Sequence, residues 1–219
     1  MFVFSNLAIS VDGKIAPASR EHCPIGTPYD REMMQEIRRK SDCILMGAST
    51  IRAYKKPCLA KGATQQPINA IVTRALDGFD ENWPFFTTDK MKRVLFTTEK
   101  VAREKFEILS KNSLIISLEP LQPGRSHAEQ MMSALEKQCG VKNLLVEGGG
   151  HVMWDFASLN LIDEYYVTLA PKILGGVDSP TMVEGAGFKP SEFLNLNIKS
   201  SRVVGDEIYL CYQKTNIRG

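Results

Sequence analysis

Short apolar runs alternate with helical patterns along the first two thirds of this chain, and this alternation limits its possible folds more than any other feature. Strand-like runs occupy residues 1–11, 43–46, 69–73, 94–97, 114–117 and 143–147. Helical patterns occupy residues 28–40, 102–110, 126–138 and 150–154, and a further helix can begin at 48–50. Strands that alternate with helices in this way predict a mostly parallel sheet covered by helices.

The last third of the chain has a different pattern. Residues 164–169, 193–201 and 207–213 are predicted strands, and a Gly205-Asp206 turn would join the last two as an antiparallel hairpin. The predicted fold class is therefore α/β, with a mixed, mostly parallel sheet and a C-terminal antiparallel hairpin. Residues 55–66 and 77–92 are predicted polar loops, and residues 1–219 are predicted to form a single domain.

Local signals predict how two helices begin and end. Thr27 precedes Pro28, so the Thr27 side chain is expected to accept backbone N–H bonds while Pro28 fills the first helical position. Asp30 suits the positive end of the same helix. Gly140 is expected to end the helix 126–138 in the left-handed conformation.

The charge balance and the cysteines argue against several classes of partner. The chain has 27 Lys and Arg residues against 25 Asp and Glu, a net charge of +2, which gives no reason to expect nucleic-acid binding. No apolar run approaches the roughly 18 residues that span a bilayer, and the first ten residues lack the basic start of a signal peptide. Five cysteines without a C-x-x-C pair suit a reducing compartment. We expect a cytoplasmic protein that binds neither nucleic acid nor membrane.

The clearest local signal is the run Gly148-Gly149-Gly150 between a predicted strand and a predicted helix. Backbone N–H groups at such a helix start can approach a diphosphate closely. The same glycines also suit a plain strand-to-helix turn that needs positive φ, and the dinucleotide fingerprint G-x-G-x-x-G is absent. Both interpretations remain open from the glycines alone.

Glu147 precedes this run, at the carboxyl end of a predicted central strand, where open α/β sheets bind ligands. It either takes part in function or holds the glycine turn by hydrogen bonds. Arg38, in the last turn of the first helix, suits the negative helix end. The three histidines have no ligand spacing, and the zinc-deaminase and G-x-S-x-G signatures are absent, so no metal or serine hydrolase site is expected.

Four stretches of the chain, in the expected order, resemble the reductase domain of riboflavin biosynthesis. They are residues 6–16, 37–50, 145–150 and 161–176. That family has a dihydrofolate-reductase-like fold, so the resemblance implies a three-layer α/β/α arrangement. It also implies that NADPH reduces 5-amino-6-(5-phosphoribosylamino)uracil, or a close relative, to the ribityl compound. Members commonly form homodimers, and the deaminase domain that precedes some of them is not matched here.

The resemblance also assigns roles to residues. The implied cofactor contacts are Ala8, Gly47, Thr50, Arg74, Gly148, Gly149, Gly150, His151 and Val152. The implied substrate contacts are His22, Arg38, Leu59, Lys61 and Glu147. Arg74 would recognise the 2′-phosphate of NADPH, and Glu147 would accept hydrogen bonds from the pyrimidine. Glu147 and Asp12 are the predicted catalytic residues, Asp12 as a proton donor, although Asp12-Gly13 also suits a plain turn.

The chain departs from the family pattern in the segment after Thr50. Members usually carry an Asp-Asp-Pro-x-Leu run there, followed by a basic residue, whereas this chain has Lys55-Lys56-Pro57-Cys58-Leu59 and then Lys61. His22 also stands where serine is usual. Because these changes fall on the substrate half of the site, two alternatives remain: a related reductase of another pterin or pyrimidine, and a non-catalytic NADP-binding dimeric module.

Overall fold

The structure is a computed structural model that describes residues 1–74, 76, 78–97, 103–120 and 126–215. The chain divides into two compact units. Unit 1 consists of Met1 and residues 35–145, and unit 2 consists of residues 2–34 and 146–219.

The described residues form nine strands and six α-helices. The strands are β1 (Phe2–Ser10), β2 (Cys43–Gly47), β3 (Ile68–Thr73), β4 (Arg93–Thr97), β5 (Leu114–Ser117), β6 (Asn143–Val146), β7 (Glu164–Ala170), β8 (Leu196–Val204) and β9 (Glu207–Lys214). The helices are α1 (Pro28–Arg38), α2 (Ala48–Tyr54), α3 (Pro84–Thr87), α4 (Arg103–Ser110), α5 (Ala128–Cys139) and α6 (Gly150–Ala157), and a 3-10 turn, η1, covers Pro190–Glu192.

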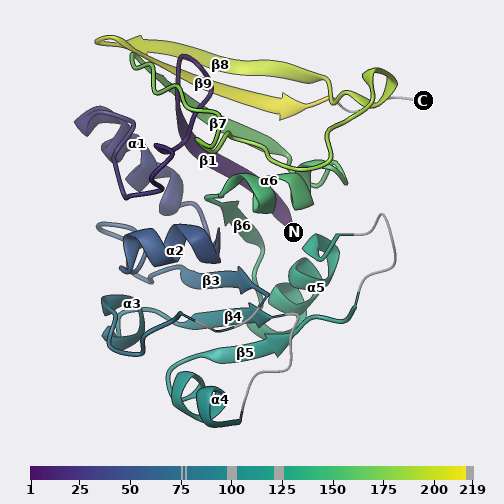
Figure 1. The fold of residues 1–219 in the computed structure, drawn as a ribbon. Helices are drawn as coiled ribbons and strands as arrows, with labels where there is room; N and C mark the ends of the chain where they lie inside the picture. Colours follow the sequence, from purple (N-terminus) through teal and green to yellow (C-terminus); the bar gives the residue numbers. More distant parts are fainter. Residues whose placement is uncertain (75, 77, 98–102, 121–125, 216–219) are drawn as a thin grey trace. The chain divides into compact units, whose positions relative to one another are not determined.

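Unit 1 is built on a parallel sheet. Its strands lie in the order β5, β4, β3, β2 and β6, and the neighbours from β2 to β5 pair in parallel. Every residue of β2 and β4 is buried, as expected for parallel strands that are covered on both faces. Helix α2 contacts β2 and β3, and α4 contacts β5 (Figure 1). Because β2 and β3 run in parallel, Gly47 and Arg74 lie at the same edge of this sheet.

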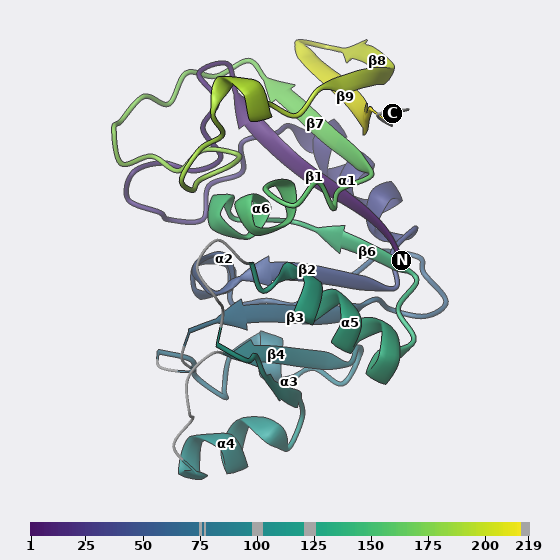
Figure 2. The same cartoon turned by 90° about the vertical axis from the view of Figure 1, so that its right-hand side faces the viewer.

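Unit 2 combines parallel and antiparallel pairing. Strands β1 and β7 are parallel, with Ala8 opposite Thr168. Strand β9 pairs antiparallel with β7 and with β8, so β8 is the outer strand of this unit (Figure 2). Most of β8 is exposed, including the apolar side chains of Ile198 and Val203. The predicted fold class, an α/β fold with a mixed, mostly parallel sheet and a C-terminal antiparallel pair, is confirmed.

Most predicted elements are present, and β8 shows the largest shift. It begins at Leu196 rather than at residue 193, because the chain first closes the turn η1, where the carboxylate of Glu192 accepts the backbone N–H of Lys189 at 3.2 Å. Phe193 therefore lies outside the strand and is exposed. Gly205 adopts positive φ in the predicted hairpin turn, and Gly140 ends α5 in the predicted left-handed conformation.

The predicted polar loop 77–92 is wrong in part. It contains the helix α3, and Phe79, Phe85 and Phe86 are buried there. The rings of Phe85 and Phe86 meet edge to face, with centroids 5.0 Å apart. Charged and polar residues between these aromatics lower the mean hydropathy of the segment, so the aromatic cluster left no periodic signal in the sequence.

Thr27 has a partner that local sequence did not predict. It precedes α1 as expected, and its carbonyl accepts the N–H of Arg31 at 3.2 Å. Its hydroxyl, however, donates to Glu207 Oε2 at 2.5 Å, and its backbone N–H donates to Glu207 Oε1 at 2.7 Å. Because Glu207 begins β9, the contact joins segments that are 180 residues apart in sequence.

Candidate active site

The glycine turn of unit 2 leads from Glu147 into α6. Gly148 has a φ of 84°, Gly149 is extended at the N-cap position, and the peptide bond between them is cis. Gly149 has no side chain to cap the helix, and the first turn of α6 contains no acidic residue. The positive φ supports the structural interpretation of the run, and the uncapped N–H groups at the start of α6 are also suited to an anion.

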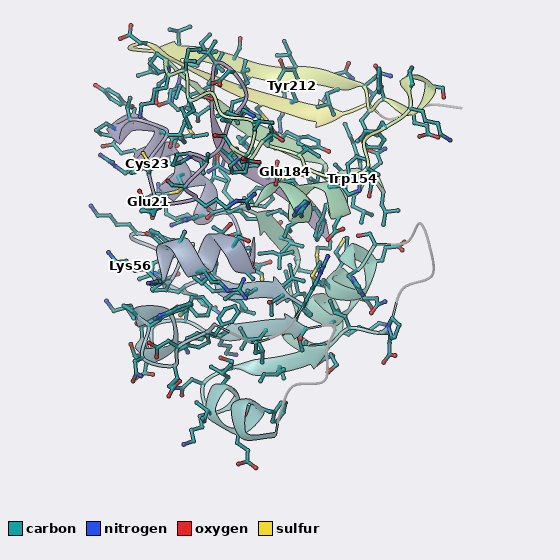
Figure 3. The ribbon with its side chains drawn as sticks, in the orientation of Figure 1. Glu21, Cys23, Lys56, Trp154, Glu184 and Tyr212 are labelled. Carbon is teal, nitrogen blue, oxygen red and sulfur yellow. The ribbon has the colours of Figure 1, made fainter. Side chains whose placement is uncertain are left out.

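Residues 181–188 pack against α6 and explain why Gly150 has no side chain. A Cβ at Gly150 would lie 2.7 Å from the carbonyl oxygen of Thr181. The backbone N–H of Glu184 donates to the Gly150 carbonyl at 3.0 Å, and the ring of Trp154 lies 4.8 Å from that of Phe188. Figure 3 labels Glu184 and Trp154 beside α6. The start of α6 is therefore held in place by a distant segment of the same unit.

The neighbouring predicted cofactor contacts differ in exposure. His151 is exposed, and its Nδ1 lies 3.1 Å from the carbonyl oxygen of Glu184. The side chain of Val152 is buried, so only its backbone is suited to contact a cofactor. Ala8 is half-buried on β1, beside Thr168 of β7.

Asp12 holds a loop through hydrogen bonds. Its carboxylate accepts the hydroxyl of Ser10 at 2.6 Å and the backbone N–H groups of Leu174 and Gly175 at 3.1 and 2.7 Å. The bond from Ser10 contributes most to lowering the pKa of Asp12 to about 2, followed by the two backbone bonds. At neutral pH this group is an ionised acceptor, which suits an anchor of the loop after β7 better than a source of protons.

A second carboxyl of unit 2 lies in the opposite environment. Asp30, in the first turn of α1, accepts a hydrogen bond from the side chain of Thr168, which is 2% exposed. Burial is the largest effect on Asp30 and raises its pKa. The negative charges of Glu207 and Glu147 raise it further, while the bond from Thr168 and the charge of Arg31 lower it. The protonated form of Asp30 therefore persists to higher pH than in an ordinary aspartate.

Glu207 supplies a buried negative charge beside Asp30. It is 1% exposed and accepts hydrogen bonds from Thr27 and from the hydroxyl of Tyr209 at 2.5 Å. Burial alone would raise the pKa of Glu207, but these bonds and the charge of Lys172 keep it below its usual value. Sequence reasoning missed this group because its members come from α1, β7 and β9. The only local signal was an aspartate at the start of a helix.

The predicted substrate contacts of unit 1 lie together. Arg38 is 5% exposed, and its Nη1 donates to the carbonyl oxygen of Leu59 at 3.4 Å. The backbone N–H of Lys61 donates to the side chain of Gln35 at 2.7 Å. The end of α1 therefore orders the backbone of residues 59–61. His22, by contrast, is exposed in the segment of unit 2 that precedes α1.

The two lysines that replace the usual acidic pair follow α2. Lys55 caps α2 in the left-handed conformation, and its Nζ lies 5.7 Å from the centre of the Trp83 ring. Lys56 is exposed at the end of the helix (Figure 3). Thr50 lies in the first turn of α2, three residues after the N-cap Gly47. Arg74 follows β3, and its carbonyl accepts the hydroxyl of Thr97 at 2.9 Å.

Comparison with known proteins identifies the family. The family model described as the RibD C-terminal domain matches residues 1–210. The chain belongs to the RibD C-terminal domain family. The predicted resemblance is thereby confirmed over almost the whole chain.

Two relatives carry the same printed name, 2,5-diamino-6-ribosylamino-4(3H)-pyrimidinone 5′-phosphate reductase. The protein from Archaeoglobus fulgidus is 30% identical over 198 residues, which cover 85% of this chain and 88% of the relative. The protein from Aquifex aeolicus is 29% identical over 220 residues, which cover 95% and 94%. The predicted function agrees with the reaction for which these two proteins are named.

Solved structures support the fold. The RibD of Acinetobacter baumannii superposes with a TM-score of 0.79 at 20% identity, over 98% of this chain and 58% of that one. The chain thus spans little more than half the length of that RibD. A dihydrofolate reductase from Enterococcus faecalis superposes with a TM-score of 0.55 at 12% identity, in agreement with the predicted dihydrofolate-reductase-like fold.

Two kinds of feature are absent from the described residues. No helix among them is both long enough and apolar enough to cross a membrane. No group of three or more His, Cys, Asp or Glu side chains in the same part of the chain is arranged to hold a metal ion.

Proposed function

We propose that this chain is an NADPH-dependent reductase of riboflavin biosynthesis. Its substrate is a 2,5-diamino-6-ribosylaminopyrimidinone 5′-phosphate or the uracil relative 5-amino-6-(5-phosphoribosylamino)uracil, and its product is the ribityl compound. The observation that carries the proposal is Glu147 followed by the glycine turn at the start of α6, in a chain of the RibD C-terminal domain family. The names of the Archaeoglobus and Aquifex relatives favour the diamino substrate.

The start of α6 fits the phosphate groups of a dinucleotide. Gly148 turns the chain with positive φ, and the N–H groups of Gly150 and His151 begin a helix whose first turn carries no acidic residue. Gly149, Val152 and Ala8 complete the predicted contacts of unit 2, and Gly47, Thr50 and Arg74 are those of unit 1. When bound, NADPH supplies the hydride for the reduction.

The remaining residues bind and orient the substrate. Glu147 accepts hydrogen bonds from the N–H groups of the pyrimidine. Arg38 holds the backbone at Leu59, and Gln35 holds it at Lys61. Arg38, Leu59 and Lys61 are the proposed contacts of the ribosyl phosphate, with His22 as a fourth. Asp12 keeps the loop at Leu174 and Gly175 in place rather than supplying a proton.

We also propose that the enzyme is a cytoplasmic homodimer. The exposed outer strand β8 carries Ile198, which is 62% exposed, and Val203, which is 68% exposed. Apolar side chains on an outer strand favour pairing with a second copy. Sedimentation at several protein concentrations measures the oligomeric state directly.

The test of function is NADPH oxidation with the diamino and uracil substrates, each assayed separately. Glu147→Gln should lower kcat/KM about 100-fold, a loss typical of removing one key polar contact from an active site. Asp206→Asn, on the exposed hairpin turn, is the matched carboxyl control and should retain wild-type activity. Oxidation with a dihydropterin alone would favour the other reductase, and NADPH binding without any turnover would favour the non-catalytic module.

A further inference from the structure

Asp30 is a carboxyl group to which the sequence assigned only a helix-dipole role. It lies in the first turn of α1 and is bonded to Thr168 on β7. Thr168 stands opposite Ala8 in the parallel pairing of β7 with β1, and Ala8 is a proposed cofactor contact. Asp30 is therefore held beside β7, the neighbour of the strand that carries Ala8, and Glu147 is close enough to act on it electrostatically.

The groups around Asp30 favour its protonated form. Three charged groups act on Asp30. Arg31 lies on α1 itself, Glu147 follows β6, and Glu207 begins β9. Glu207 is buried and stays ionised because Thr27 and Tyr209 donate to it. The positive charge of Lys172, which follows β7, lowers the pKa of Glu207. Two carboxylates and burial oppose a third negative charge at Asp30, and the bond from Thr168 and the cation of Arg31 offset them only in part.

The side chain of Asp30 also has little freedom to move away from this position. A Cβ at Gly26 would lie within 2.4 Å of the Asp30 side chain, so Asp30 packs directly on the backbone of the segment before α1. Together with the bond from Thr168, this contact holds the carboxyl between α1 and β7. A fixed carboxyl that carries a proton is the arrangement that general acid catalysis requires.

We propose that Asp30 is the proton donor of the reduction, with Thr168 as its positioning residue. The proposal rests on the proposed function. C1′ of the open-chain imine accepts a hydride with its electron pair, the π electrons of the C=N bond move to nitrogen, and nitrogen takes the proton of Asp30. The products are the secondary amine of the ribityl side chain, the oxidised nicotinamide and the Asp30 carboxylate, which regains a proton from water.

The first arm of the test is kinetic. The kcat of the wild type should fall as the pH rises through the pKa of Asp30. Asp30→Asn should lower kcat about 100-fold on the acid side of that limb, abolish the limb and change the KM for NADPH by less than about twofold. A kcat in Asp30→Asn within about twofold of wild type, or an alkaline limb that persists in this variant, would overturn the proposal.

Two further variants should move the alkaline limb in opposite directions. Glu207→Gln removes a negative charge and should move the limb to lower pH. Thr168→Val removes a donor to the Asp30 carboxylate and should move the limb to higher pH. These shifts do not depend on whether Asp30→Asn folds. Identical profiles in both variants would contradict the assignment of the limb to Asp30.

The second arm needs no turnover. Titration of the ligand-free full chain, with ¹³C in the aspartate carboxyl carbons, should show one resonance whose pKa lies above the ordinary aspartate value of about 3.9 and that is absent from Asp30→Asn. A normal titration of Asp30 would refute its role as the acid even if the enzyme is active. If no substrate is turned over, the proposed function fails, whereas the carboxyl titration still reports on the proton of Asp30.

Discussion

Asp12 and Asp30 both belong to unit 2, yet their surroundings prepare them for opposite tasks. Asp12 is exposed and accepts hydrogen bonds from Ser10, Leu174 and Gly175, which stabilise its ionised form. Asp30 is half-buried, receives one bond and lies near two other carboxylates, which stabilises its protonated form. The contrast teaches that donors and charges from distant segments, rather than a place in a turn or a helix, decide what a carboxyl group can do.

The largest expected effect separates the two aspartates by their catalytic contributions. Asp30→Asn should lower kcat about 100-fold although it folds at least as stably as wild type, because the amide keeps the shape of the acid and carries no charge but cannot give a proton. Asp12→Asn should lower Tm, and its loss of activity should parallel the loss of folded protein. Steady-state kinetics and thermal unfolding of both variants make the comparison. Equal losses of kcat in two fully folded variants would remove the distinction.

The pH dependence of stability should have opposite signs at the two sites. The lowered pKa of Asp12 means that its contribution is present above the unfolded value of about 3.9 and disappears as the pH falls to about 2. The raised pKa of Asp30 means that its contribution is present at low pH and disappears as the pH rises through the folded value.

Thermal unfolding measured from about pH 2 upward reports the contributions of both aspartates to stability. The Tm difference between wild type and Asp12→Asn should shrink on acidification below about pH 4. Asp30→Asn should gain stability relative to wild type as the pH rises. If the Tm difference from wild type changed in the same direction with pH for both variants, Asp12 and Asp30 would have similar environments.

The smallest expected effect sharpens the account of Asp12. Ser10 is fully buried, and its Oγ donates to Asp12 while accepting the backbone N–H of Lys14 at 2.9 Å. Ser10→Ala should therefore lower the free energy of unfolding by about 1 kcal/mol, the usual contribution of a buried hydrogen bond. Ser201→Ala, on the exposed strand β8, is the matched control. Equal free energies of unfolding for the two variants in urea would mean that the hydrogen bond from Ser10 to Asp12 does not stabilise the fold.

The sequence predicted the parts of the molecule that depend on neighbouring residues. The apolar run 43–46 and Gly47 gave β2 and the start of α2, and Gly148 has the positive φ that a strand-to-helix turn requires. Parts that depend on distant residues were missed. The buried phenylalanines within 77–92 lacked periodicity, and the group of Asp30, Thr168 and Glu207 is assembled from three separate elements.

The candidate site shows the same division. Glu147 and the glycine turn were found because they are adjacent in sequence, and the family model covers them. The anchoring role of Asp12 could not be found, because Leu174 and Gly175 are more than 160 residues away. Its Asp12-Gly13 turn was predicted correctly, with a φ of 78° at Gly13.

The most direct test of the reductase assignment follows the hydride itself. The full chain is incubated with NADPH that carries deuterium at both C4 positions of the nicotinamide and, in separate reactions, with the diaminopyrimidinone and the uracil substrate, and each product is examined by mass spectrometry and NMR. The account predicts a ribityl product with one deuterium at C1′. Deuterium on the pyrimidine ring, or no transfer from bound NADPH to either substrate, would contradict it.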